Sequence, residues 1–268
     1  MNLAICSLAS SSSGNCHLIK SENTNLILDC GVSVSKIKGD LKDFDLELED
    51  IEAVLITHEH SDHIKGLKTL MKKAPKIKCY MTEGTKNEIL SKLEIDEDRI
   101  EIAKPGEEII IGDIHVNPIR VSHDTPDPAC YSFGNGEGRI SVVTDTGYVT
   151  EEIYEGIKDS DILVMESNHE RNILLAGSYP YQIKYRILSD VGHLSNEVCA
   201  QTILRMLKEL EGRKVPRVVL AHLSKENNTP QQAMITVKNI LEEEGYYIGK
   251  DVEVTVANRE AHGEFLEI

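Results

Sequence analysis

The alternation of apolar runs and turn residues predicts short strands through most of the chain and long helices in its last third. Strands are expected at residues 3–8, 16–20, 25–28, 53–57, 78–81, 108–111, 114–121, 130–134, 139–144, 162–165, 218–221 and 252–256. Helices are expected over 64–73, 195–210 and 230–244, with Ser195 as an N-cap and Gly212 and Gly245 as stops. This mixture is typical of a layered α/β protein. No Pro/Gly-rich linker divides the chain, so we expect a single domain over residues 1–268.

The charge balance narrows the class of protein. The formal net charge of −16 argues against a general nucleic-acid coat or a membrane-surface protein, but it permits one local site for a phosphate-bearing substrate. No apolar stretch is long enough for a membrane helix, and Met1-Asn2 lacks the basic start of a signal peptide. The six cysteines show no C-x-x-C pairing, which indicates reduced thiols. We therefore expect a cytoplasmic protein with no membrane partner.

Ligand-type side chains are concentrated directly after the predicted strand at 53–57. His58 and His60 project to the same side of an extended segment, and Asp62 and His63 follow where a helix begins. A lone His is more often a hydrogen-bonded structural residue. Three His and one Asp this close would repel one another unless a cation lay between them. The cluster predicts a metal site, and its imidazoles and carboxylate suit Zn, Mn or Fe.

Other candidate ligands stand just after predicted strands elsewhere in the chain. They are Asp29, His123, Asp145 and His222. Ligands collect at such strand ends in layered α/β folds. Each of the four could equally serve as a capping or turn residue. Together with the His cluster they would complete the shells of two metals.

The order of these residues resembles the metallo-β-lactamase fold of metal-dependent hydrolases. That resemblance implies an α/β (α+β) protein built as a four-layer αββα sandwich, with two divalent metal ions. It assigns one metal to His58, His60 and His123. It assigns the other metal to Asp62, His63 and His222, with Asp145 bridging both and Asp29 supporting the site by hydrogen bonds.

Further segments are similar to the bacterial YycJ/WalJ subfamily. They include residues 7–15, 57–67, 121–128, 166–169, 192–196 and 221–230. The subfamily is associated with 5′ to 3′ exonuclease action on DNA and with DNA repair. The resemblance therefore implies a nucleic acid substrate, DNA in the first place. Two divalent ions suit this chemistry, because they lower the pKa of a shared water and neutralise charge on the phosphoryl group.

A proton donor for the leaving group is expected near Gly192-His193. This segment resembles the downstream His motif of the tRNA 3′-processing nucleases with this fold, and Glu166 resembles their partner acid. We expect His193 to act as general acid or phosphate contact, oriented by Glu166, with Asp62 also counted among the catalytic residues. The alternative is that His193 merely precedes the helix cap at Ser195.

Substrate contacts are expected from Lys184 and Arg186, which lie among tyrosines, and from His169. Bases could stack on a tyrosine while Lys or Arg meets phosphate. The alternative is an exposed helix face with solvated charges.

Two other functions stay open at this point. The same arrangement of metal ligands supports many reactions in different proteins, so a hydrolase of a small thioester, lactone or other ester is one alternative. A non-catalytic, metal-stabilised regulatory module is the other, although a structural site needs no second metal. A homodimer is a possible assembly.

Overall fold

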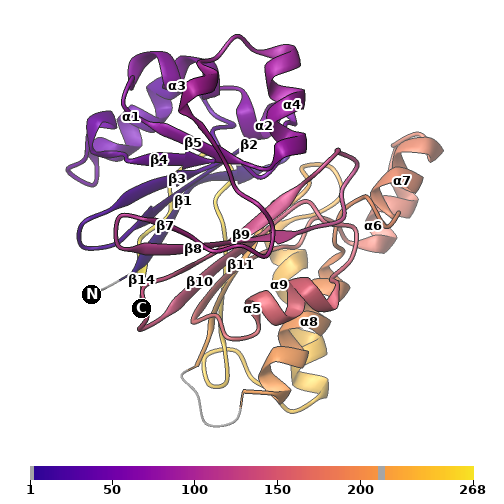
Figure 1. Cartoon of the computed structure of the whole chain (residues 1–268). Helices are drawn as coiled ribbons and strands as arrows, with labels where there is room; N and C mark the ends of the chain where they lie inside the picture. Colours follow the sequence, from indigo (N-terminus) through magenta and orange to yellow (C-terminus); the bar gives the residue numbers. More distant parts are fainter. Residues whose placement is uncertain (1–2, 211–214) are drawn as a thin grey trace. The chain divides into compact units, whose positions relative to one another are not determined.

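The computed structural model describes residues 3–210 and 215–268, coloured along the chain in Figure 1. The chain divides into two compact units. Unit 1 consists of Met1–Arg120, Thr125–Gly138 and Asn258–Ile268, and unit 2 consists of Val121–Asp124 and Arg139–Ala257. The single domain expected from the sequence stays a prediction. Gly212, expected to end a helix, lies outside the described residues.

A mixed sheet forms the centre of unit 1, with the strand order β14-β1-β2-β3-β4-β5-β6. Its strands are β1 (Ala4–Ser11), β2 (Gly14–Lys20), β3 (Asn25–Leu28), β4 (Ala53–Leu55), β5 (Lys78–Met81), β6 (Ile100–Ile102) and β14 (Leu266–Glu267). The strands from β14 to β3 pair antiparallel, and those from β3 to β6 pair parallel. The carboxyl ends of β3 and β4 therefore meet at the same edge, where Asp29 and the segment of His58 begin.

Helices cover one face of this sheet (Figure 1). They are α1 (Val34–Lys42), α2 (Ser61–Ile64), α3 (Leu67–Lys73) and α4 (Glu83–Lys92), with short 3₁₀ turns at Leu48–Asp50 and Glu97–Arg99. Leu67 and Leu70 of α3, Ile37 of α1 and Ile89 of α4 join one apolar core with the strands. The prediction of one continuous helix over 64–73 was wrong, because the helix is interrupted at Gly66, between α2 and α3.

An antiparallel meander completes the strands of unit 1. It consists of β7 (Ile109–Ile111), β8 (Ile114–Arg120) and β9 (Ala129–Gly134). The hydroxyl of Tyr131 in β9 donates to the backbone carbonyl of Ile56, 3.0 Å away. This bond fixes the chain just before the His cluster.

Unit 2 is a parallel ladder with helices. Its strands are β10 (Arg139–Val143), β11 (Ile162–Glu166), β12 (Arg217–Ala221) and β13 (Glu253–Val256). Its helices are α5 (Glu151–Ile157), α6 (Arg171–Ala176), α7 (Tyr181–Ile187), α8 (Asn196–Lys208) and α9 (Pro230–Glu243). Helices α8 and α9 lie side by side (Figure 1). As predicted, the hydroxyl of Ser195 caps α8 and Gly245 follows the end of α9 with a φ of 83°.

Three predicted site residues adopt left-handed backbone conformations at strand ends. Asp29 follows β3 with a φ of 60°, Asp145 follows β10 with a φ of 58°, and His222 follows β12 with a φ of 54°. Non-glycine residues in this region are uncommon and cluster where function constrains the backbone. Their predicted placement at strand ends is confirmed.

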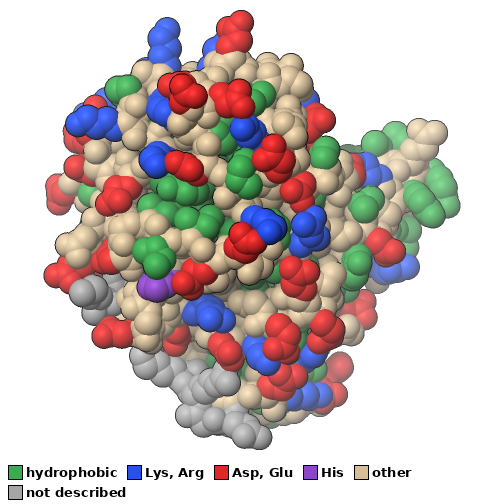
Figure 2. All heavy atoms as spheres, in the orientation of Figure 1, with side chains coloured by type: hydrophobic (Ala, Val, Ile, Leu, Met, Phe, Trp, Pro, Cys, Tyr) green, Lys and Arg blue, Asp and Glu red, His purple; other side chains and the backbone are tan. Residues whose placement is uncertain are grey.

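None of the helices in the described part of the chain combines the length and hydropathy that a bilayer crossing requires. Figure 2 shows acidic side chains spread over the visible face, with lysines and arginines between them. This distribution agrees with the net charge of −16.

Candidate metal centre

Three imidazoles of unit 1 pack against one another in the segment that runs from the end of β4 into α2. The ring centroid of His58 lies 4.6 Å from that of His60 and 4.0 Å from that of His63. Nε2 of His63 lies 3.6 Å from a carboxylate oxygen of Asp62. His58 and His63 are buried. The structure thus gathers all four residues of the sequence cluster.

Asp29 and Thr57 orient two of these rings. The carboxylate of Asp29 accepts from the backbone N–H of Thr57 at 2.9 Å and from Nδ1 of His63 at 2.8 Å. The Thr57 hydroxyl donates to Asp29 at 3.0 Å and lies 3.0 Å from Nδ1 of His58, from which it can accept. Both rings then carry their proton on Nδ1, which leaves the Nε2 lone pairs available to a metal.

Asn15 adds a neutral contact at this site. Its side-chain amide lies 3.1 Å from Nε2 of His63, where it can donate to the lone pair. A metal at that nitrogen would replace this hydrogen bond. The amide of Asn15 is therefore placed to donate to the lone pair on Nε2 of His63, while Asp29 accepts the proton of Nδ1.

Unit 2 brings together a second group of ligand-type side chains. Asp145, Glu166, His193 and His222 offer ligand atoms that all lie within 4.8 Å of one another. Oε1 of Glu166 is 2.8 Å from Nδ1 of His193 and 2.9 Å from Nδ1 of His222. Nδ1 of His123 lies 3.2 Å from the carbonyl oxygen of Gly192, to which it can donate.

Glu166 is a buried carboxylate surrounded by donors. Burial alone would raise its pKa, but the neighbouring His193 and the hydrogen bonds from His193 and His222 outweigh it and lower the pKa to about 2. Its second oxygen accepts from the backbone N–H groups of Thr146 and Leu194, each at 3.2 Å. Glu166 is therefore an anion that fixes the protons of both imidazoles on Nδ1.

The surroundings of His193 and His123 shift the pKa values of the two imidazoles in opposite directions. Burial lowers the pKa of His193, but the charges of Glu166 and Asp145 raise it overall. For His123, burial dominates and lowers the pKa, which favours the neutral ring that binds a metal. The side chain of His193 stays 13% exposed, while that of His123 is fully buried. Of these two rings, His193 thus has the raised pKa and some access to solvent.

The donor sets in both units fit divalent metal ions. Unit 1 supplies His58, His60, Asp62 and His63, and unit 2 supplies His123, Asp145 and His222, with Glu166 behind them. Neutral imidazoles with oriented Nε2 lone pairs and a few carboxylates suit Zn, Mn or Fe. Carboxylates that hold the far ring nitrogen of a ligand histidine are typical of such sites.

The predicted substrate residues are engaged in contacts inside unit 2. Nζ of Lys184 lies 2.7 Å from the carbonyl oxygens of Leu175 and Gly177. Arg186 forms a bidentate ion pair with Asp124 at 2.6 and 2.8 Å. His169 is buried and its pKa is lowered to about 4, chiefly by desolvation. Their role in binding substrate stays a prediction.

From the sequence, no positioning role was expected for Thr57 or Asn15. Thr57 was predicted as the end of a strand, and Asn15 stood only in a segment that resembles the subfamily. The signal for Thr57 was its place directly before His58. Asn15 ends the segment 7–15 that resembles the YycJ/WalJ subfamily, but the sequence did not reveal its contact with His63, which lies 48 residues further on.

Fold and donor set together define a class, the metal-dependent hydrolases of metallo-β-lactamase fold. A family model described as the beta-lactamase superfamily domain matches residues 24–223. The crystal structure of the metallo-β-lactamase fold protein YhfI from Bacillus subtilis superposes with a TM-score of 0.74 at 15% identity, covering 100% of both chains. The α+β class and the metallo-β-lactamase fold expected from the sequence are confirmed.

Comparison with curated relatives narrows the class to a subfamily. The chain is 37% identical over 255 residues to the exodeoxyribonuclease YycJ of Bacillus anthracis, covering 95% of each chain. It is 37% identical over 252 residues to the exodeoxyribonuclease WalJ of Streptococcus pneumoniae serotype 2, covering 92% of this chain and 91% of that one. The chain belongs to the beta-lactamase superfamily and, within it, to the YycJ/WalJ-like proteins.

Proposed function

We propose that this protein is an exonuclease that hydrolyses DNA with two divalent metal ions, Zn, Mn or Fe. The relatives named exodeoxyribonuclease, similar over almost the whole chain, support this substrate and this reaction. The observation that carries the proposal is the pair formed by His193 and Glu166. A carboxylate 2.8 Å from Nδ1 raises the pKa of a partly exposed imidazole among the candidate metal ligands, which suits a donor of the proton that a phosphodiester leaving group needs.

The proposed ligands come from both units. His58, His60 and His123 would hold one metal, Asp62, His63 and His222 would hold the other, and Asp145 would be shared by both. The oriented imidazoles of unit 1 and the carboxylate network of unit 2 support this assignment. When bound, such metals polarise the phosphoryl group and supply a hydroxide nucleophile near neutral pH.

The residues of the chain supply the remaining steps. His193 donates the proton from Nε2 to the leaving oxygen, since its Nδ1 is held by Glu166 at 2.8 Å. Glu166 raises the pKa of this ring and at the same time orients His222. Asp29 and Thr57 hold His63 and His58 in the ligating tautomer. The alternative role of His193 as a mere neighbour of the helix cap leaves its contact with Glu166 unexplained.

Exposed aromatic rings on α7 support a single strand as substrate. Tyr181 and Tyr185 are 79% and 67% exposed, and their rings are stacked with centroids 6.3 Å apart. Apolar side chains gather there on the surface (Figure 2). Bases stack on such rings without regard to sequence. Lys184 and Arg186, on the same helix, would meet phosphate only by exchanging their present partners.

We further propose 5′ to 3′ polarity, a role in DNA repair, a cytoplasmic location and a possible homodimer. The polarity and the role in DNA repair rest on the resemblance to the YycJ/WalJ-like proteins, and the cytoplasmic location follows the expectation from the sequence. The strongly acidic surface fits binding at strand ends better than binding along a duplex, since a general DNA binder carries a basic stripe.

The test is a substrate panel run separately with Mn, Zn, Fe and Mg. The panel contains 5′- and 3′-labelled single- and double-stranded DNA, RNA, bis-p-nitrophenyl phosphate, a thioester and a lactone. Stepwise shortening of DNA from the 5′ end is the expected result. Turnover of the thioester or lactone alone would assign the site to small esters, and no turnover of any substrate would favour a regulatory module.

A further inference from the structure

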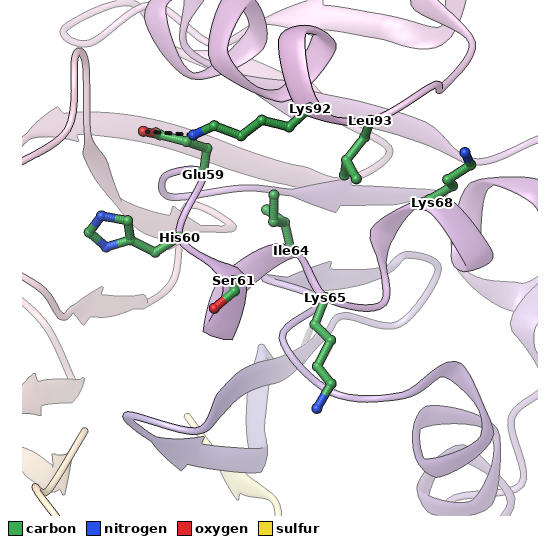
Figure 3. Close-up of a pocket in the computed structure, with 8 residues that line it drawn as sticks. All are labelled: Glu59, His60, Ser61, Ile64, Lys65, Lys68, Lys92 and Leu93. Atoms are coloured by element: carbon green, nitrogen blue, oxygen red, sulfur yellow. Dashed lines mark ion pairs between the residues drawn. The ribbon is translucent and has the colours of Figure 1, made fainter.

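A pocket in unit 1 lies next to His60, one of the proposed metal ligands. Its volume is about 400 Å³, which falls in the range of about 300–1,000 Å³ that is common for ligand sites. Figure 3 shows the residues that line it: Glu59, His60, Ser61, Ile64, Lys65, Lys68, Lys92 and Leu93. They come from the segment before α2, from α2 itself, from the start of α3 and from the end of α4. Three lysines thus line one hollow in a strongly acidic protein.

The middle of the pocket is apolar. Ile64 and Leu93 approach each other across it in Figure 3, and both also pack on the core of unit 1. Apolar side chains give no stabilisation to a bare anion. They do favour a flat, weakly polar group such as a nucleobase, whose faces lose water on binding.

Glu59 offers an acceptor at one end. Its side chain is only 5% exposed, and Oε1 lies 4.0 Å from Nζ of Lys92. Oε2 is buried and has no hydrogen-bond partner among the residues that the structure describes. A buried acceptor without a donor is unfavourable by about 1–3 kcal/mol. Every nucleobase carries an N–H donor on its Watson–Crick edge, whereas a phosphate diester carries only acceptors.

Lys65 and Lys68 lie on the side away from Glu59 (Figure 3). Lys68 pairs with Glu94 at 3.2 Å, but Glu94 is 97% exposed, so this pair contributes little and exchanges readily. Lys65 makes no ion pair within the described chain. In Figure 3 their side chains point away from each other, so each ammonium group can meet a different phosphate of a strand at low desolvation cost.

We propose that this pocket binds one nucleotide of the substrate strand. The base packs between Ile64 and Leu93 with its edge at Glu59, and the phosphates on either side of the nucleotide meet Lys65 and Lys68. This inference rests on the proposed nuclease function and locates part of its substrate next to the ligand His60.

The first experiment compares two double variants with equal charge changes. Lys65→Ala/Lys68→Ala removes the phosphate contacts, and Lys73→Ala/Lys76→Ala removes two exposed lysines that do not line the pocket. The measurement is fluorescence anisotropy of a labelled, phosphorothioate-protected 12-mer of single-stranded DNA on metal-loaded protein. The pocket variant should raise the Kd at least tenfold and reduce the salt slope by about 0.7–1.4, while the control stays within twofold.

Metal content and Tm, measured on each variant, show that the ligand segment is intact. Unchanged binding by the pocket variant, or equal weakening by both variants, would overturn the phosphate contacts. In a second arm, a deoxynucleoside monophosphate should displace the oligonucleotide at least tenfold better than inorganic phosphate. Equal competition by the two would remove the base from the pocket.

The outcomes separate this inference from the proposed function. If the protein binds the oligonucleotide through the pocket but leaves unmodified DNA intact with every metal, the pocket proposal stands and the nuclease proposal fails. If the protein degrades DNA while the pocket variant binds the oligonucleotide normally, the nuclease proposal stands and the pocket proposal fails. Wild-type protein that neither binds nor degrades DNA contradicts both.

Discussion

Oε1 of Glu166 lies 2.8 Å from Nδ1 of His193, and the same oxygen lies 2.9 Å from Nδ1 of His222. One buried carboxylate thus sets the tautomer of the proposed proton donor and of a proposed metal ligand. The arrangement follows from sheet register, because Glu166 ends β11 opposite Ala221 of β12, the residue before His222. Loss of this one charge should therefore disturb both proton transfer and metal binding.

Glu166→Gln should lower metal affinity by about 10–100-fold. Oε2 accepts from two backbone N–H groups, so the amide oxygen of Gln must remain there and its NH₂ must face the imidazoles. His222 would then need its lone pair on Nδ1, and Nε2 would carry the proton. Metal titration into chelated protein by calorimetry measures the effect. Glu226→Gln, an exposed charge on the same unit, serves as the control, and equal affinities in both variants would contradict the shared role.

His193→Ala should retain metal yet slow turnover by about 10²-fold or more, if the ring is the general acid. The control His115→Ala removes a histidine whose side chain is 44% exposed on β8. Turnover is measured on labelled DNA and metal content by elemental analysis. Near-normal turnover of His193→Ala would reduce this residue to a neighbour of the cap at Ser195.

The pH profile gives a second view of the same group. A general acid works only when protonated, so kcat should fall as the pH rises through the pKa of His193. The raised pKa of His193 carries this fall to a higher pH than an ordinary imidazole would show. Glu166→Gln removes the charge that raises the pKa, so the fall should move to lower pH. A profile that keeps the same alkaline limb in His193→Ala would assign it to another group.

Local patterns predicted the elements that depend on few contacts. The strands at 25–28 and 78–81 have the bounds expected for them, and α8 begins at its predicted cap. Helix α4 was missed because it buries only Thr85 and Ile89, too few apolar positions to show a helical period. A helix of this kind forms through packing on the sheet, which no local pattern reports.

The same limit applies to the site. The His58–His63 cluster was predictable because its members are adjacent in sequence, so that any fold holds them together. The link from Glu166 to His222 spans 56 residues and depends on the pairing of β11 with β12. The contact of Asn15 with His63 depends likewise on tertiary packing. Sequence supplied the donors, and packing supplied the partners that fix their protons.

Gly31→Ala should displace the ligand segment of unit 1. A Cβ at this position would lie 1.6 Å from the backbone oxygen of Asp62, so α2 would have to move. We expect metal affinity and Tm both to fall. Gly39→Ala is the matched control, because Gly39 lies inside α1 with nothing within 4 Å, and the change should stabilise by about 0.5–1 kcal/mol. Thermal unfolding measures Tm, and metal titration measures the affinity. Wild-type metal affinity in Gly31→Ala would contradict the close packing of Gly31 on Asp62.

Asp29→Asn should weaken metal binding with little strain on the backbone. Asn tolerates the left-handed conformation at φ 60°, so the variant keeps the turn and loses only the charge. Its oxygen can still accept from the Thr57 N–H, which turns the NH₂ toward Nδ1 of His63. The ring must then carry its proton on Nε2, the atom that a metal needs. We expect an affinity loss of about 10–100-fold by calorimetric titration.

Asp29→Ala should cost more, because alanine adds backbone strain of about 1–2 kcal/mol to the loss of buried acceptors. Variants of Asp45 separate the backbone strain from the loss of hydrogen bonds, because Asp45 is exposed and has a similar φ of 57°. Asp45→Ala should lower the free energy of unfolding by the strain alone, and Asp45→Asn should change almost nothing. Denaturant unfolding of the chelated protein measures all four variants. If Asp29→Ala is no less stable than Asp45→Ala, the hydrogen bonds of Asp29 to Thr57 and His63 do not stabilise the fold.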